Sequence, residues 1–201
     1  MMNTRTFFLV LMNVTFLICR VSAAADAPVR FLALGKPSAI RIQGTAKTLE
    51  SEKPAWKDGK FSGTYHVLLN ELETGISMRD RHMKEKYLEV EKFPKADLML
   101  SDCPVKLGES KCEGQVTLHG VTQKVPLNVA WSRGSSSDEW LAHSRFILKL
   151  SEFGIKIPTF ANITVAEDVT VEVDSSVKEP KALVSDSAKT PSSPTQPQLK
   201  N

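Results

Sequence analysis

Hydrophobic and polar residues alternate along five stretches of this chain, and this period of two is its strongest structural signal. The residues that share one face in these stretches are Phe61, Gly63, Tyr65, Val67 and Leu69; Val116 and Leu118; Val125, Leu127, Val129 and Trp131; Trp140, Ala142, Ser144, Phe146, Leu148 and Leu150; and Val169, Val171 and Val173. The alternation predicts β-strands that each bury one face. Shorter strands are expected at residues 31–34, 39–45 and 98–101.

About eight short strands separated by turn signals indicate an all-β domain, built either as a sandwich or as a closed barrel. Residues 76–88 are the exception, because Ile76, Met83 and Tyr87 fall on one stripe of a helix. Thr74 is the expected N-cap if the helix includes Ile76, and Asp80 if the helix begins later. We expect this single short helix to lie against the barrel, across one end.

The two ends of the chain differ in composition from its centre. Residues 1–24 resemble a signal peptide, with Arg5 ahead of an apolar stretch at 7–18 and small residues at 22–24. Residues 175–201 are rich in Ser and Pro and hold too few large apolar groups to offset the entropy cost of ordering, so we expect a disordered tail. One domain is therefore predicted at residues 25–174, in the periplasm or secreted.

The charge balance of the chain favours no electrostatic partner. Removal of Arg5 and Arg20 with the predicted signal peptide lowers the basic count from 26 to 24, against 23 acidic residues, and the formal charge from +3 to +1. Nucleic-acid binding, which needs a clustered basic face, is not expected. A transient membrane contact and a homodimer are the partner hypotheses left open.

Cys103 and Cys112 are the cysteines outside the predicted signal peptide. The segment between them contains Gly108 and is typical of a hairpin connection. Antiparallel strands bring Cα atoms within disulfide reach, and export places both thiols in an oxidising compartment. Because the CxxC redox spacing is absent and a metal site would need further ligands, we predict a structural disulfide.

No motif in the sequence predicts catalysis. The HExxH and GxSxG patterns are absent, and no glycine-rich phosphate loop follows a strand into a helix. The four histidines, His66, His82, His119 and His143, do not have the spacing of a zinc hydrolase. We predict no enzyme activity, no cofactor and no metal site; a metal-assisted hydrolase built from scattered histidines is the most distant hypothesis.

Two segments resemble a known family. Residues 72–94 read LETGISMRDRHMKEKYLEVEKFP, and residues 114–127 read GQVTLHGVTQKVPL. At this separation they resemble the YceI-like, polyisoprenoid-binding family of small secreted proteins. The resemblance implies an antiparallel, eight-stranded lipocalin-like barrel that encloses an isoprenoid or fatty chain in an apolar tunnel. The first strands and residues 156–164 depart from the family pattern, and these departures predict a shortened or capped tunnel.

The inward strand rows supply the candidate ligand-binding residues. On this reading the tunnel is lined by Phe61, Tyr65, Val67, Val116, Leu118, Trp131, Trp140, Phe146 and Leu148. Arg79 and His82 are the candidates for meeting a polar head group at the barrel mouth. The alternative for Arg79 is structural, an ion pair or cap with Asp80 that orders the loop.

A second hypothesis for the whole protein involves no ligand. An eight-stranded barrel is just wide enough either to hold one small ligand or to be filled by its own side chains. In the filled case the chain is a non-catalytic envelope or stress-response structural protein.

Overall fold

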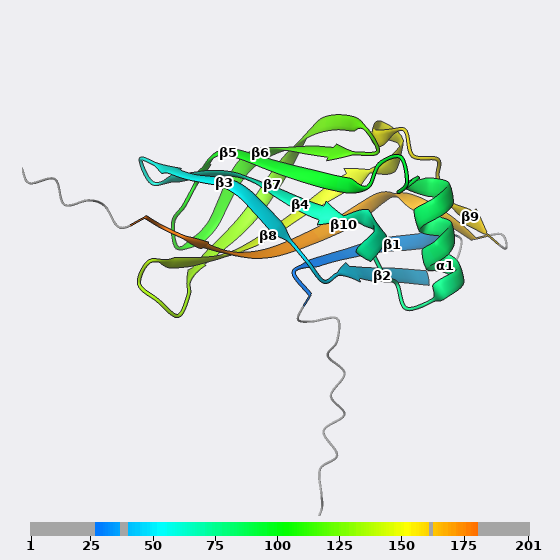
Figure 1. Ribbon diagram of the computed structural model, residues 1–201, viewed down its shortest axis with the longest axis horizontal. Helices are drawn as coiled ribbons and strands as arrows, with labels where there is room; N and C mark the ends of the chain where they lie inside the picture. The colour runs from blue at the N-terminus through cyan, green and yellow to red at the C-terminus, as the bar shows by residue number, and fades with distance from the viewer. Residues whose placement is uncertain (1–26, 37–39, 161–162, 181–201) are drawn as a thin grey trace, which may run out of the picture.

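The computed structural model describes residues 27–36, 40–160 and 163–180 (Figure 1). The predicted signal peptide and residues 181–201 of the predicted tail lie outside this range. The strands are β1 Val29–Lys36, β2 Ile40–Ala46, β3 Glu50–Lys57, β4 Lys60–Leu68, β5 Lys95–Pro104, β6 Gly108–Leu118, β7 Val121–Arg133, β8 Glu139–Lys149, β9 Thr159–Phe160 and β10 Ile163–Lys178. Short helical segments are η1 Leu69–Glu71, α1 Ser77–His82, the π-helical η2 Met83–Tyr87, and η3 Leu150–Phe153.

The strands form one antiparallel sheet in the order β2-β1-β10-β8-β7-β6-β5-β4-β3, with β9 paired to β10. The lipocalin-like, all-β class predicted from the sequence is confirmed, although the described residues form ten strands instead of eight. The sheet curls without closing, because its edge strands β2 and β3 do not pair with each other. Thr45 of β2 pairs instead with Glu73, which follows η1, each accepting the other's backbone N–H at 2.9 Å.

Burial follows the predicted alternation closely. In β8 the side chains of Trp140, Ala142, Ser144, Phe146 and Leu148 are buried, while their neighbours on the chain are exposed or half-buried. The same holds for the row from Val125 to Trp131 in β7. Since the side-chain period of a strand is two, the face that the sequence marks as apolar is the face that lines the interior.

The domain boundary expected at residue 174 falls inside β10, so that prediction is wrong by a few residues. β10 pairs with β8 from Asp168 to Lys178, and Val177 is buried. The amino-acid composition did not reveal where the strand ends. Ser175 and Ser176 pair with β8 through backbone hydrogen bonds, which do not depend on the hydrophobicity of their side chains.

One end of the curled sheet is filled by aromatic rings. Phe61 is 1% exposed and packs against Trp131, with ring centroids 6.2 Å apart at 68°. Trp131 in turn meets Trp140 at 6.4 Å and 87°, and Trp56 meets Phe61 at 5.4 Å. Edge-to-face packing of this kind adds to the large apolar area that each ring buries. The β3–β4 and β7–β8 hairpins lie at this end (Figure 1).

The helical segment lies across the other end, as predicted (Figure 1). It is held in place by the β6–β7 turn, where His119 has a positive φ of 52°. His119 Nε2 lies 2.7 Å from a carboxylate oxygen of Glu89, and its ring lies 4.4 Å from that of Phe93. Gly120 is required beside it, because a Cβ there would stand 2.7 Å from the Phe93 ring. The turn therefore anchors the chain just after η2.

The predicted disulfide between Cys103 and Cys112 is present, with Cα atoms 5.3 Å apart. The β5–β6 ladder ends at Leu100 opposite Gly114. The bridge therefore joins the two strands beyond their last paired residues, where hydrogen bonds no longer hold them together.

Replacing both cysteines by alanine should lower the free energy of unfolding by about 2–3 kcal/mol, because the bridge restricts a short loop in the unfolded chain. Urea unfolding of the double variant measures this loss, and reduced wild-type protein is the matched control. An unchanged urea midpoint in both the double variant and the reduced protein would mean that the paired residues of the β5–β6 ladder hold the two strands together without the disulfide.

Candidate functional site

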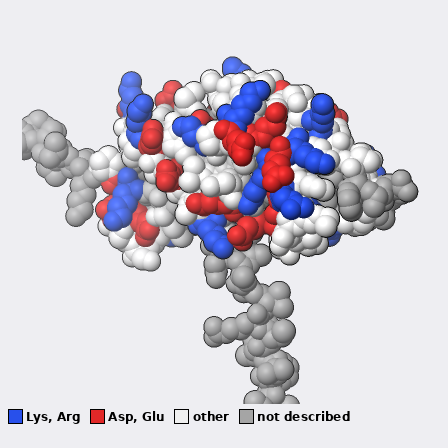
Figure 2. All heavy atoms as spheres, turned by 45° about the vertical axis from the view of Figure 1, so that its right-hand side comes forward, with Lys and Arg blue, Asp and Glu red and all other residues white. Residues whose placement is uncertain are grey.

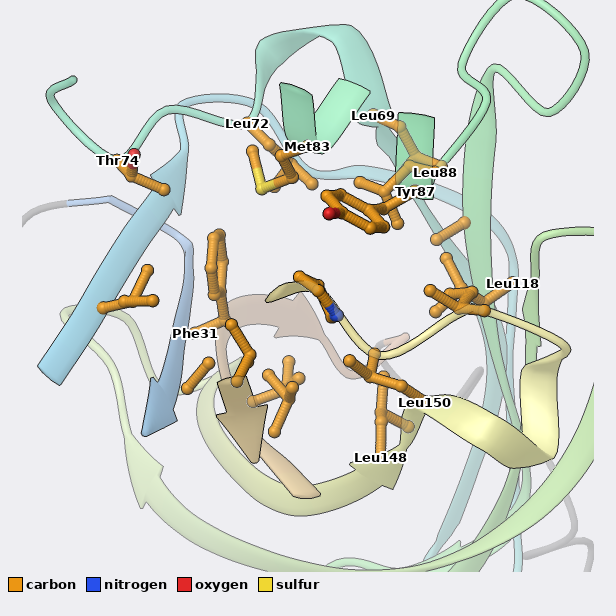
Figure 3. A pocket seen from close by; sticks show the side chains of 18 of the residues that line it. Phe31, Leu69, Leu72, Thr74, Met83, Tyr87, Leu88, Leu118, Leu148 and Leu150 are labelled. Carbon is orange, nitrogen blue, oxygen red and sulfur yellow. The ribbon is translucent and has the colours of Figure 1, made fainter. Parts of the chain in front are cut away.

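An apolar cavity of about 630 Å³ occupies the end of the sheet that lies beneath the helix (Figure 3). Phe31 borders it on one side, Leu118 and Leu148 on the other, and Met83 and Tyr87 reach in from the helical segment. The lining is almost entirely hydrocarbon. Ligand pockets for small amphiphiles have this size and character.

The cavity exists because the residues at this end are smaller or turned aside. Ala33 and Ala96 line it where the opposite end carries tryptophan. The Phe31 ring packs over Gly44, where a Cβ would stand 2.2 Å from the ring. The absence of a side chain at Gly44 therefore lets Phe31 lie against the wall.

The helical cover contacts the interior mainly through its second half. No residue of α1 is buried, whereas Leu88, directly after η2, is only 8% exposed. The helix begins after Ile76 without a side-chain cap, so the predicted capping roles of Thr74 and Asp80 are wrong. Asp80 instead accepts the backbone N–H of Thr74 at 2.8 Å and also contacts its hydroxyl.

Arg79 belongs to the same small network. Its Nε donates to the Thr74 hydroxyl at 2.7 Å, and another guanidinium nitrogen donates to the Thr74 carbonyl at 2.8 Å. These bonds tie the loop before α1 to the helix. They favour the structural hypothesis for Arg79 over contact with a head group.

Most of the predicted ligand-binding residues do line this cavity. The strand and helix residues placed there are Tyr65, Val67, Arg79, His82, Val116, Leu118, Phe146 and Leu148. Phe61, Trp131 and Trp140 do not; they belong to the aromatic end. They share strand faces with lining residues, but they lie too far along the barrel axis to reach the cavity.

Sequence reasoning missed the contribution of the first two strands and of β10. The lining residues not predicted there are Val29, Phe31, Ala33, Ile40, Ile42, Ile163, Val165, Val169, Val171 and Val173. The alternating valines of β10 were a usable signal, since they were already recognised as an inward row. β1 gave no such signal, because Leu32 and Leu34 place apolar side chains on its other face as well.

The described histidines sit apart, so they form no common site. His66 Nδ1 lies 2.6 Å from an Asp97 oxygen, and His143 Nδ1 lies 2.7 Å from an Asp174 oxygen. Within residues 27–36, 40–160 and 163–180 no group of three or more His, Cys, Asp or Glu side chains could hold a metal ion. The same residues contain no helix long and apolar enough to cross a membrane.

The unequal filling of the two ends can be tested by one pair of substitutions. Phe61→Ala should lower the free energy of unfolding by about 3–5 kcal/mol, because it opens a void in tight packing. Phe31→Ala should lower it by less than about 2 kcal/mol, because that ring already borders open space. Urea unfolding measures the free energy lost by each variant. Equal losses would mean that side chains fill the cavity in solution.

Comparison with known proteins agrees with this architecture. Among solved structures, Burkholderia cenocepacia BcnA superposes with a TM-score of 0.62 at 16% identity, covering 75% of this chain and 96% of that one. A polyisoprenoid binding domain from Saccharophagus degradans, implicated in plant cell wall breakdown, gives 0.53 at 16% identity, covering 77% and 97%. At this identity the likeness concerns the fold.

Sequence relatives point the same way. A UPF0312 protein of Pseudomonas syringae pv. tomato is 32% identical over 109 residues, covering 50% of this chain and 56% of the relative. One of Pseudomonas fluorescens is 33% identical over 103 residues, covering 47% and 52%. The chain thus aligns with about half the length of these curated relatives. The model of the YceI-like domain matches residues 29–177, and the chain therefore belongs to the YceI-like family.

Proposed function

We propose that this protein is a binding protein that holds the chain of an isoprenoid or fatty amphiphile in the cavity beneath α1. The observation that carries this proposal is a hollow of about 630 Å³ with an almost wholly hydrocarbon lining. The solved Saccharophagus degradans domain of the same fold, described as polyisoprenoid binding, supports the ligand class. We place the protein in the periplasm or outside the cell, on the signal-like residues 1–24.

Burial of the chain is sufficient to drive such binding. Each enclosed methylene contributes roughly 0.8 kcal/mol, so a dozen carbons give on the order of 10 kcal/mol. Association and ordering remove several kcal/mol of this, and the remainder corresponds to about micromolar affinity or better. Few polar contacts are needed, which fits a site whose Arg79 is already engaged by Thr74.

The rim of the cavity suits a transient membrane contact during loading. Ile40, Ile76 and Met78 line the cavity and are also 37%, 53% and 56% exposed. Figure 2, which brings the helical end forward, shows positive and negative side chains interleaved over this region. We propose that the contact rests on these apolar side chains and not on net charge. The predicted homodimer stays a prediction.

The competing hypothesis, a filled barrel with a structural role, accounts for only part of the interior. Phe61, Trp131 and Trp140 fill the aromatic end as that hypothesis requires. The other end does not have comparable packing. The cavity favours the carrier over the purely structural protein.

Protein purified from a native periplasmic extract should carry an isoprenoid or fatty species in about equimolar amount, detectable by solvent extraction and mass spectrometry. Delipidated protein should gain roughly 5–10 °C in melting temperature when the lipid is added at about a hundred times its dissociation constant. A lipid-free preparation whose melting temperature also ignores added lipid would support the filled structural barrel.

Obstructing the cavity should abolish binding without unfolding the protein. Val171→Trp places a large ring into the hollow, because Val171 lines it from β10. Thr170→Trp is the matched control, since the neighbouring side chain points to the other face of the strand. We expect the first variant to lose the lipid-induced thermal shift and the second to keep it. Retention of the shift in both would place the ligand elsewhere.

A further inference from the structure

A second hollow, here called the seam pocket, lies where the two edges of the curled sheet approach each other. Its volume is about 500 Å³, and polar groups make up much more of its lining than they do in the apolar cavity. Leu49 and Tyr65 line both hollows, so the two spaces adjoin at these side chains. Tyr65 therefore stands between a hydrocarbon-lined space and a polar one.

The seam pocket arises because β10 is longer than its neighbour. Val173 is the last residue of β10 in the ladder with β1, and Asp174 still donates its backbone N–H to the Pro28 carbonyl at 2.7 Å; from Ser175 on, β10 pairs with β8 alone. The free edge of β10 lies across the pocket from residues 47–51. Ser175 reaches over this gap and donates from Oγ to the phenolic oxygen of Tyr65 at 3.2 Å.

Hydroxyl groups converge at the boundary between the hollows. Ser51 lies directly opposite Tyr65 in the β3–β4 ladder, a position that brings Cβ atoms within about 4.5–5.5 Å. Because Ser175 donates to Tyr65, the phenolic proton of Tyr65 is left to donate to a ligand oxygen. Burial raises the pKa of Tyr65, so the phenol keeps this proton at neutral pH.

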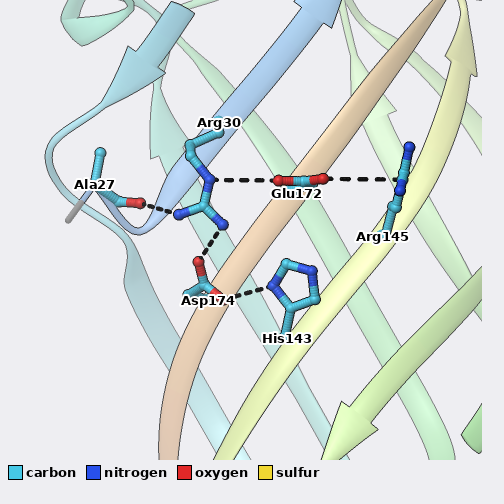
Figure 4. A network of polar contacts seen from close by, with 6 residues as sticks. All are labelled: Ala27, Arg30, His143, Arg145, Glu172 and Asp174. Atoms are coloured by element: carbon cyan, nitrogen blue, oxygen red, sulfur yellow. Dashed lines mark hydrogen bonds and ion pairs between the residues drawn. The ribbon is translucent and has the colours of Figure 1, made fainter. Parts of the chain in front are cut away.

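The charges around the seam pocket do not suit an anion. Lys47 is the one cation among its lining residues, and its Nζ already lies 3.4 Å from a carboxylate oxygen of Glu73. Asp174 is held on the outer face by Arg30 at 2.6 Å and His143 at 2.7 Å (Figure 4). An uncharged hydroxyl group can use the Tyr65, Ser51 and Ser175 hydroxyls without meeting unbalanced carboxylates.

We propose that the seam pocket binds an uncharged, hydroxyl-bearing head group of the amphiphile whose chain fills the cavity. This inference rests on the proposed function and specifies its ligand as a long-chain alcohol. The chain extends from the rim beneath α1 to Tyr65, and the head passes between Tyr65 and Leu49. The ligand hydroxyl accepts a hydrogen bond from Tyr65.

The test compares probes that share one isoprenoid chain and differ at the head: farnesol, the hydrocarbon farnesene, and farnesyl phosphate. Titration calorimetry of the full chain gives the dissociation constant for each. Tyr65→Phe removes only the phenolic oxygen. Thr64→Val is the matched control, because it removes a hydroxyl from the neighbouring residue of β4, whose side chain lies on the other face of the strand and lines neither hollow. Melting curves establish that both variants are folded.

The Tyr65→Phe variant should bind farnesol roughly three- to tenfold more weakly than wild type and farnesene equally well, because one neutral hydrogen bond is lost. Thr64→Val should change neither dissociation constant. Wild-type protein should bind farnesyl phosphate more weakly than farnesol. Ser51→Trp, which fills the seam pocket, should reproduce the selective loss of farnesol.

Two results would overturn the inference in different ways. If Tyr65→Phe leaves the preference for farnesol over farnesene unchanged, the head group lies elsewhere, and the proposed function stands because the chain still binds. If wild-type protein binds none of the three probes, the proposed function fails and the seam-pocket assignment fails with it.

Discussion

The binding site depends on one constraint. Large side chains fill the interior of the curled sheet at one end only. An interior of this width must be occupied by side chains or by a ligand. Phe61, Trp131 and Trp140 occupy the hairpin end with edge-to-face contacts. Their burial supplies a rigid scaffold, and the other end, lined by smaller side chains such as Ala33 and Ala96, can remain hollow.

The cover over the hollow end is fixed at both of its ends, because α1 itself buries no residue. Arg79 and Asp80 bind Thr74 before the helix, and His119 holds Glu89 after it. The contact between His119 and Glu89 joins the two segments, residues 72–94 and 114–127, that carry the family resemblance. Their joint occurrence in the sequence therefore has a physical reason, since each segment positions the other over the cavity.

The open seam gives the cavity a second, polar neighbour that a fully paired barrel would lack. A closed ladder between β2 and β3 would satisfy every backbone group there and leave no gap. Instead, the bridge between Thr45 and Glu73 closes only part of the edge, and Tyr65 separates two chemically different spaces. This arrangement allows a chain and its head group to occupy separate surroundings.

The sequence alone determined the strand faces, the helix at residues 76–88 and the pairing of Cys103 with Cys112, because these depend on local period and short loops. It could not separate Phe61 from Tyr65, since alternation reveals which face is buried but not the depth along the barrel. Only the tertiary structure decided which end is hollow and where the seam lies. Both follow from pairings between strands far apart in the chain, which no local pattern encodes.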